Sequence, residues 1–349
     1  MVIEDESIAE VILLTELPPE SSLRGTSLRP DGRVLAARLD LPELYQFDPQ
    51  NPDTPPRLLY TFPDTSGLLK VCPLKGRHDE YAILSGTLDV ATSEFSKPLI
   101  WLMVLSPNDD EPPKVTLIME LKGTAFPATC VAATERTLLV PDSGLACIWG
   151  VDIEEGRCEK LIEDESMGPA PPNETTGESE FYGISVLELV GDWAYFSNES
   201  RGTLGRFPIS YGRRTGDDEE PDDGWDIHPI DDVRVITDRI PHSDSLAFAK
   251  DPNVGYSPNY VTGQLRRIDI DPVTGSSEVR VVMENLVTPV AVELVYPEDG
   301  GRPKMIVLCT GEIDMSWIKD HEASWSDIAN INGSVSVTVV TTEETVEVP

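Results

Sequence analysis

One short pattern recurs along the chain, and it constrains the fold more than any other feature. Apolar and polar residues alternate over five or six positions, which is the period of a β-strand with one buried face. The six copies are Leu44–Pro49, Ile100–Leu105, Ile148–Ile153, Leu204–Ile209, Leu265–Ile270 and Val335–Val339. Their second residues, at positions 45, 101, 149, 205, 266 and 336, are 56, 48, 56, 61 and 70 residues apart. Six copies of one unit at this spacing predict a β-propeller with four strands in each blade.

The other strands can be placed around these six anchors. Inner strands are expected to start near Thr26, Leu68, Thr129, Gly183, Ser245 and Val290. The sixth blade lacks an outer strand after Val340, whereas Val11–Thr15 precedes the first blade without a partner. We therefore predict one six-bladed, all-β propeller over residues 1–349, with the N-terminal strand closing the last blade so that no sheet edge is left open. A β-sandwich or a pair of β domains would not explain six matching frames.

Charge and composition exclude several classes of function. The 27 Lys and Arg residues stand against 62 Asp and Glu residues, a net charge of −35, which disfavours nucleic acid and anionic membrane surfaces as partners. No apolar run approaches the roughly 20 residues that span a bilayer. The acidic start at Glu4–Glu6 is unlike a secretory signal, so a cytoplasmic location is predicted. The five cysteines form no C-x-x-C pair and are interpreted as small buried apolar residues.

Long connections gather on one predicted face. Connections between second and third strands, and from an outer strand to the next inner strand, leave a propeller on the same side. The long connections Glu163–Phe181, Ser210–Asp232 and Thr310–Gly333 and the shorter Ser85–Lys97 are all of these kinds. This face is therefore expected to carry the function. No hydrolase elbow, zinc-protease, nucleotide-loop or dinucleotide motif occurs in the chain.

Six segments resemble a known family. Ser27–Leu35, Leu138–Leu145 and Trp193–Asn198 resemble blades of the senescence-marker-protein, gluconolactonase and strictosidine-synthase group, and Pro42–Tyr45, Tyr60–Leu69 and Gly202–Ile209 resemble a fungal branch of it. The likeness runs from about Leu17 to Val339. It implies a six-bladed propeller that binds its ligand in a central pocket on the loop-rich face.

The metal-dependent lactonases of this group hold a divalent ion with a Glu, two Asn-type residues and an Asp. The corresponding segments here are Phe126–Thr129 and Phe181–Gly183, and the first inner strand offers Arg24 in place of a Glu. Only Asp244 matches an acidic position. Divalent ions need several converging oxygens, so we predict no metal and no cofactor.

Position in this frame selects the candidate site residues. Tyr182, Arg24 and His242 are candidate hydrogen-bond donors, and Asp244 is a candidate base or orienting group. The candidate substrate-binding residues are Thr26, Leu68, Phe126, Thr129, Thr288, Trp317 and Trp325. Each also has a plain structural interpretation, such as a core aromatic for Tyr182, a strand cap for Asp244 or a surface residue for His242. Together they predict an apolar and aromatic cup for hydrophobic small-molecule substrates.

Some members of the fungal branch are biosynthetic hetero-Diels–Alderases, which join a tropolone-derived o-quinone methide to a humulene-type sesquiterpene olefin. The resemblance therefore implies a pericyclase. Two alternatives remain open at this point: a metal-dependent lactonase or esterase, and a propeller that binds a small molecule or a protein without catalysis.

Overall fold

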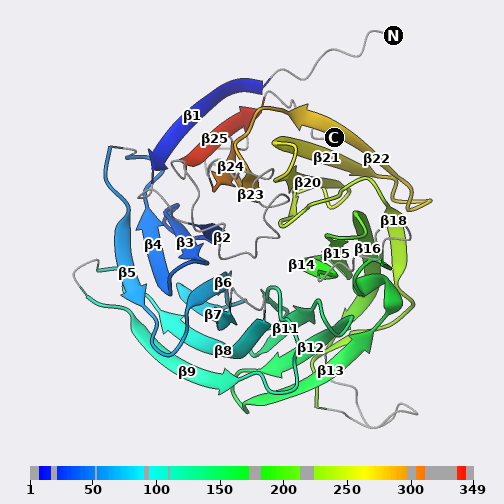
Figure 1. The fold of residues 1–349 in the computed structure, drawn as a ribbon, viewed down its shortest axis with the longest axis horizontal. Helices are drawn as coiled ribbons and strands as arrows, with labels where there is room; N and C mark the ends of the chain where they lie inside the picture. Colours follow the sequence, from blue (N-terminus) through cyan, green and yellow to red (C-terminus); the bar gives the residue numbers. More distant parts are fainter. Residues whose placement is uncertain are drawn as a thin grey trace.

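The chain folds into antiparallel sheets that stand around a common axis (Figure 1). The computed structural model describes residues 8–16, 22–51, 53–89, 94–108, 111–172, 182–212, 224–296, 304–310 and 336–342. Within this part of the chain, all regular structure is β except one 3-10 turn at Glu165–Met167. The prediction of an all-β propeller is confirmed. No helix in the described ranges is long and apolar enough to cross a membrane.

Five sheets each come from one continuous stretch of chain. The first sheet contains β2 (Leu23–Leu28), β3 (Val34–Arg38), β4 (Glu43–Phe47) and β5 (Arg57–Thr61). The second sheet contains β6 (Gly67–Pro73), β7 (Glu80–Asp89), β8 (Glu94–Val104) and β9 (Lys114–Glu120). The third sheet contains β10 (Val131–Ala132), β11 (Thr137–Asp142), β12 (Cys147–Asp152) and β13 (Arg157–Glu163). The fourth sheet contains β14 (Ile184–Val190), β15 (Trp193–Asn198), β16 (Thr203–Tyr211), β17 (Ile227–Pro229) and β18 (Arg234–Thr237). The fifth sheet contains β19 (Ala247–Phe248), β20 (Val254–Asn259), β21 (Gln264–Ile270) and β22 (Ser277–Met283). The expected loop Ser85–Lys97 is mostly strand, because β7 and β8 pair as far as Asp89 and Glu94.

The sixth sheet combines the two ends of the chain. It contains β23 (Pro289–Val295), β24 (Lys304–Cys309), β25 (Ser336–Thr342) and β1 (Ile8–Glu16), in the order β1-β25-β24-β23. Figure 1 shows β1 lying along β25 at the rim. The N-terminal strand therefore takes the outer place that the sequence left empty, and it covers an edge that would otherwise be unpaired.

All six anchors lie on the third strand of their sheets, and a shared irregularity fixes their register. In five sheets the pairing with the outer strand shifts immediately before the anchor, at Tyr45, Trp101, Trp149, Gly205 and Arg266. In the sixth sheet the equivalent shift lies between Val337 and Thr338. Thr338, which pairs with Val307, is thus the true counterpart, and the anchor predicted at Ser336 is wrong by two residues. Because side chains alternate with a period of two, the error kept the strand and its face.

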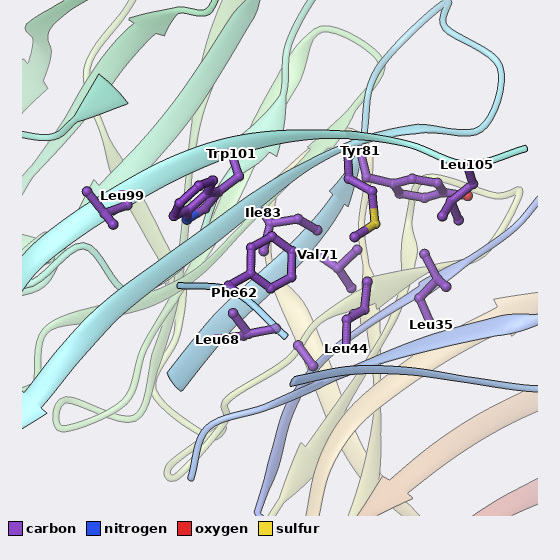
Figure 2. Close-up of a cluster of buried hydrophobic side chains, with 12 residues drawn as sticks. Leu35, Leu44, Phe62, Leu68, Val71, Tyr81, Ile83, Leu99, Trp101 and Leu105 are labelled. Atoms are coloured by element: carbon purple, nitrogen blue, oxygen red, sulfur yellow. The ribbon is translucent and has the colours of Figure 1, made fainter. Parts of the chain in front are cut away.

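The hydrophobic core lies between neighbouring sheets. Figure 2 shows one such layer, in which Leu35 and Leu44 of the first sheet meet Val71, Ile83 and other side chains of the second. These residues are almost completely buried. Burial of this kind is the main favourable contribution to folding and locks each sheet to the next around the ring.

A recurrent hydrogen bond ties each inner strand to the turn after the second strand. The backbone N–H groups of Ser143, Glu199, Tyr260 and Thr310 donate to the carbonyls of Phe126, Gly183, His242 and Thr288, respectively. In three of these sheets the preceding residue is Asp142, Asn198 or Asn259, whose side chain also bonds the incoming loop. This corner positions equivalent residues of different sheets around one end of the axis.

Candidate functional site

A small cavity lies where the inner strands meet. Its enclosed volume is about 20 Å³, room for one or two water-sized groups, and the whole space between the walls, including the opening, is about 330 Å³. Its walls come from the inner strands or the residues just before them: Arg24, Thr26, Leu69, Lys70, Ala128, Thr129, Ser185, Val186, Asp244, Ser245 and Ala291. Seven of these eleven residues are polar or charged, so the predicted apolar cup is wrong for the cavity walls.

A β-bulge at the start of four inner strands contributes three of the side chains that line the cavity. The pairing with the second strand shifts between Leu23 and Gly25, and the same shift occurs in the second, fourth and sixth sheets. A bulge adds one residue and redirects its side chain. Arg24, Leu69 and Ser185 occupy these added positions, and all three line the cavity.

Arg24 and Asp244 form the central ion pair of the site. An Nη atom of Arg24 donates to Oδ1 of Asp244 at 3.2 Å, and their side chains are 12% and 13% exposed. In the described part of the chain, this is the one hydrogen bond of a guanidinium that carries five N–H donors. Burial opposes its charge, but the carboxylates of Asp244 and Glu199 outweigh burial and raise the pKa of Arg24. The remaining donors of a permanently charged group are thus available to a ligand.

Glu199 and Tyr260 complete the charged cluster beside Arg24. The Tyr260 hydroxyl donates to the Glu199 carboxylate, and the His242 ring packs edge-on against Tyr260 with centroids 5.7 Å apart. Burial, reinforced by Glu199, raises the pKa of Tyr260, so its hydroxyl keeps its proton. The sequence analysis missed both residues. Each directly follows the asparagine that ends a second strand, so aligning Asn198 with Asn259 in the repeat would have identified them.

Three aromatic side chains pack together beside the site. The Phe126 ring lies 5.3 Å from Tyr182 and 5.2 Å from Phe95, between ring centroids. Phe126 is held by the buried Asp142 carboxylate, which accepts its backbone N–H at 2.9 Å and that of Ala125 at 2.8 Å. Tyr182 also interacts electrostatically with Arg24. Tyr182 is therefore the member of this aromatic group that interacts with Arg24.

The deeper part of the axis carries charge as well. Lys70, Glu188 and Glu293 come from the second, fourth and sixth sheets, and the Thr26 hydroxyl donates to Glu293 at 3.2 Å. Burial, partly offset by Lys70 and reinforced by Glu293, raises the pKa of Glu188 to about 7. Burial also raises the pKa of Glu293, against the effects of Lys70 and Thr26. A carboxyl group that titrates near neutral pH is suited to exchanging protons.

The structure brings most of the predicted residues together. Arg24, Thr26, Thr129 and Asp244 line the cavity, and Tyr182 and His242 lie beside them through the contacts above. Thr288 occupies the position in the sixth sheet equivalent to His242, and both have positive φ angles, 52° and 56°. Such backbone is strained for a β-branched residue.

Leu68 does not line the cavity. It is completely buried in the layer between the first two sheets (Figure 2), because the bulge gives the cavity position to its neighbour Leu69. Trp317 and Trp325, predicted to cover the pocket, lie outside the described residues.

The donor set around Asp244 does not fit a divalent metal ion. A guanidinium stands beside this carboxylate, and its positive charge opposes a second cation at the same place. Among the described residues, no three His, Cys, Asp or Glu side chains are grouped to hold a metal. The lactonase-type metal site is therefore not supported by the residues present.

Comparisons with known proteins show the fold alone. No protein-family model and no curated protein sequence matches the chain. Among solved structures, it is similar to the PQQ-bound aldose sugar dehydrogenase of Streptomyces coelicolor, at 12% identity and a TM-score of 0.58, over 96% of this chain and 98% of that one. It is also similar to a putative glucose dehydrogenase of Thermus thermophilus, at 13% identity and a TM-score of 0.55 over 95% and 99%. U3-55K gives 10% identity and a TM-score of 0.51 over 96% and 99%.

Proposed function

We propose that the protein is a pericyclase of the fungal propeller branch, which activates a planar, oxygen-bearing small molecule at the axial cavity for cycloaddition to an olefin. The observation that carries the proposal is the Arg24 guanidinium, which is fixed by Asp244 yet has most of its donors directed to no described protein group. The substrate would be a tropolone-type o-quinone methide, and the olefin a humulene-type sesquiterpene.

Charge at the site favours a neutral substrate. Arg24 and Lys70 face four carboxyl groups, those of Glu188, Glu199, Asp244 and Glu293, within a protein of net charge −35. An anionic ligand would meet this excess of negative charge. A quinone methide is neutral in its ground state, and negative charge develops on its oxygen only as the reaction proceeds.

The guanidinium would act on that developing charge. In the cycloaddition the C=C–C=O unit adds across the olefin, so that one C–C and one C–O bond form and no atom is lost. A donor to the carbonyl oxygen draws electron density from the diene and stabilises the transition state more than the ground state. Arg24 is the first donor in this scheme, and Tyr182 beside it is the second.

We assign different places to the two partners. The oxygen-bearing edge of the quinone methide would enter the polar cavity toward Arg24. The larger olefin would lie across the opening, against Phe126 and Tyr182. Holding both partners in contact lowers the barrier because their orientation is already fixed.

A hydroxymethyl precursor would first lose water at the same site. The leaving hydroxide takes up one proton while the ring hydroxyl releases another, so the step needs one acid and one base. Glu188, with a pKa of about 7, and Asp244 beside Arg24 are the candidate acid and base.

The test is a turnover assay with a hydroxymethyl tropolone and humulene. We expect the protein to raise the rate and set the stereochemistry of the adduct relative to a no-protein control, and to keep this activity after exhaustive EDTA treatment. Tyr182→Phe should lower kcat by about 10²–10³ and change KM little, because the hydroxyl is used mainly in the transition state. Tyr45→Phe, a tyrosine on the first sheet outside the cavity, is the matched control.

Three results would contradict the proposal in different ways. An unchanged rate and unchanged stereochemistry, with tight binding of either partner, would indicate a binding propeller. Lactone hydrolysis that EDTA abolishes would indicate the metal-dependent alternative. Equal effects of Tyr182→Phe and Tyr45→Phe would remove the site assignment.

A further inference from the structure

Two cysteines lie side by side in the core between the second and third sheets. Cys72 is on β6, and Cys130 directly precedes β10, the inner strand of the next sheet. They belong to the same buried hydrophobic cluster and are 2% and 1% exposed. The Cys130 thiol is hydrogen-bonded to the Cys72 thiol, so the two sulfur atoms are neighbours across the boundary between the sheets.

Alternation along β6 turns Cys72 toward the third sheet. Val71 packs in the layer between the first and second sheets (Figure 2), so the residues on either side of it face the other way. Cys72 and Lys70 therefore share one face of the strand. The Cys72 thiol also donates to the Pro73 carbonyl at 3.6 Å.

Lys70 places a positive charge beside both thiols. Its ammonium group interacts electrostatically with Cys72 and with Cys130. The hydrogen bond to Cys72, together with burial, raises the pKa of Cys130 well above its usual range, and the charge of Lys70 acts in the opposite direction. Cys130 thus keeps its proton at rest, while Lys70 stabilises a thiolate when one forms.

The axial cavity gives a small oxidant a place next to this pair. Lys70 lines the cavity, and so does Thr129, which directly precedes Cys130. The enclosed part has room for one or two water-sized groups, which is about the size of hydrogen peroxide. A peptide disulfide such as oxidised glutathione is too large for this space.

We propose that Cys72 and Cys130 form a peroxide-sensitive modification site, at which oxidation joins the second and third sheets by a disulfide bond. One thiol, as its thiolate, attacks a peroxide oxygen; the O–O bond breaks, a sulfenic acid forms, and the leaving hydroxide takes up the thiol proton to give water. The other thiol then attacks the sulfenic sulfur, so that an S–S bond replaces the S–O bond and a second water leaves. Two thiols are oxidised and one hydrogen peroxide is reduced. The inference does not depend on the proposed function.

The experiment treats the folded, full-length protein with hydrogen peroxide and then alkylates the remaining thiols. Mass spectrometry of peptides kept unreduced locates the bond, and thiol titration in denaturant measures how many thiols are lost. We expect a linked peptide that contains Cys72 and Cys130, and the loss of two of the five thiols. Dithiothreitol should reverse both changes.

Two variants sharpen the assignment. Cys130→Ser should abolish the linked peptide; if it does not fold, as judged by circular dichroism, Cys130→Ala replaces it. Cys158→Ser is the matched control, because Cys158 is the most exposed of the five cysteines and lies on β13, at the opposite edge of the third sheet from β10. It should form the same bond at an unchanged rate.

Three results would overturn the proposal. The first is oxidation of Cys158 in the folded protein with no bond between Cys72 and Cys130. The second is a bond that appears only after the protein is unfolded in urea. The third is a bond from either residue to a different cysteine.

Discussion

Arg24 and Arg29 lie five residues apart, one on β2 and one just after it, yet the fold uses them differently. Arg29 is 4% exposed, and its guanidinium donates to Asp79, Gln46 and the Ser106 carbonyl. Within the described residues, Arg24 donates once, to Asp244, and it lines the cavity. The Arg29 guanidinium bonds to several protein groups and joins the first two sheets. The Arg24 guanidinium has donors without a partner among the described residues.

The difference in hydrogen bonding distinguishes a buried charge that stabilises the fold, Arg29, from one that belongs to a candidate binding site, Arg24. A buried charge is costly unless its hydrogen bonds are satisfied, and Arg29 meets that requirement within the protein. Among the described residues Arg24 meets it only in part, and its side chain lines a cavity. An incompletely satisfied charge beside a cavity is better evidence of a binding site than charge or burial alone.

The largest expected effect is on stability. Arg29→Leu should lower the free energy of unfolding by about 3–5 kcal/mol, because it leaves the buried Asp79 carboxylate without its cation. Arg33→Leu, which removes a pair with the more exposed Asp31, should cost about 0–1 kcal/mol. Denaturant unfolding measures both, and equal losses would show that Arg29 is not a structural clamp.

The next effect is on activity. Arg24→Met should lower kcat by about 10²–10³, the range for loss of one donor to a developing oxyanion, and lower the free energy of unfolding by about 1–3 kcal/mol, because it leaves the mostly buried Asp244 carboxylate without its donor. The assay is the cycloaddition described above, with unfolding measured on the same sample. A loss of stability similar to that of Arg29→Leu, with activity per folded molecule retained, would place Arg24 in the structural class.

The smallest effect extends the comparison to a carboxyl group. The folded-state pKa of Glu188, about 7, lies above its ordinary value, so between these pH values the folded protein binds more protons than the unfolded chain. Stability must therefore fall as pH rises through this window. The loss of stability caused by ionising Glu188 is absent in acid and complete above about pH 7.

Glu188→Gln removes that titration. The free energy of unfolding of the variant minus that of wild type should increase by about 1–3 kcal/mol from acidic to alkaline pH, as measured by unfolding across the window. Glu278→Gln, on an outer strand, is the control for a general effect of lowering the net charge. Identical pH profiles for the wild type and Glu188→Gln would mean that this carboxyl ionises normally.

The sequence by itself determined the repeat and the order of the strands. Alternation with a period of two is a local property, so Tyr45, Trp149 and Arg266 could be assigned to equivalent strands without coordinates. The unpaired strand at Val11–Thr15 also predicted how the ring closes. Positions at the start of the inner strands could be proposed as a site for the same reason, because a repeat brings equivalent positions to one end of the axis.

Only the tertiary structure decided which side chains reach that axis. A bulge exchanges the roles of Leu68 and Leu69, and alternation along one strand carries no record of it, because the shift is defined against the neighbouring strand. Lys70, Glu188 and Glu293 come from three sheets, so their mutual influence depends on distances across the axis rather than along the chain. Arg24 and Arg29 look alike in the sequence. They differ because hydrogen-bond satisfaction is a property of the three-dimensional surroundings, and in this fold those surroundings come from residues as far away in the chain as Asp244.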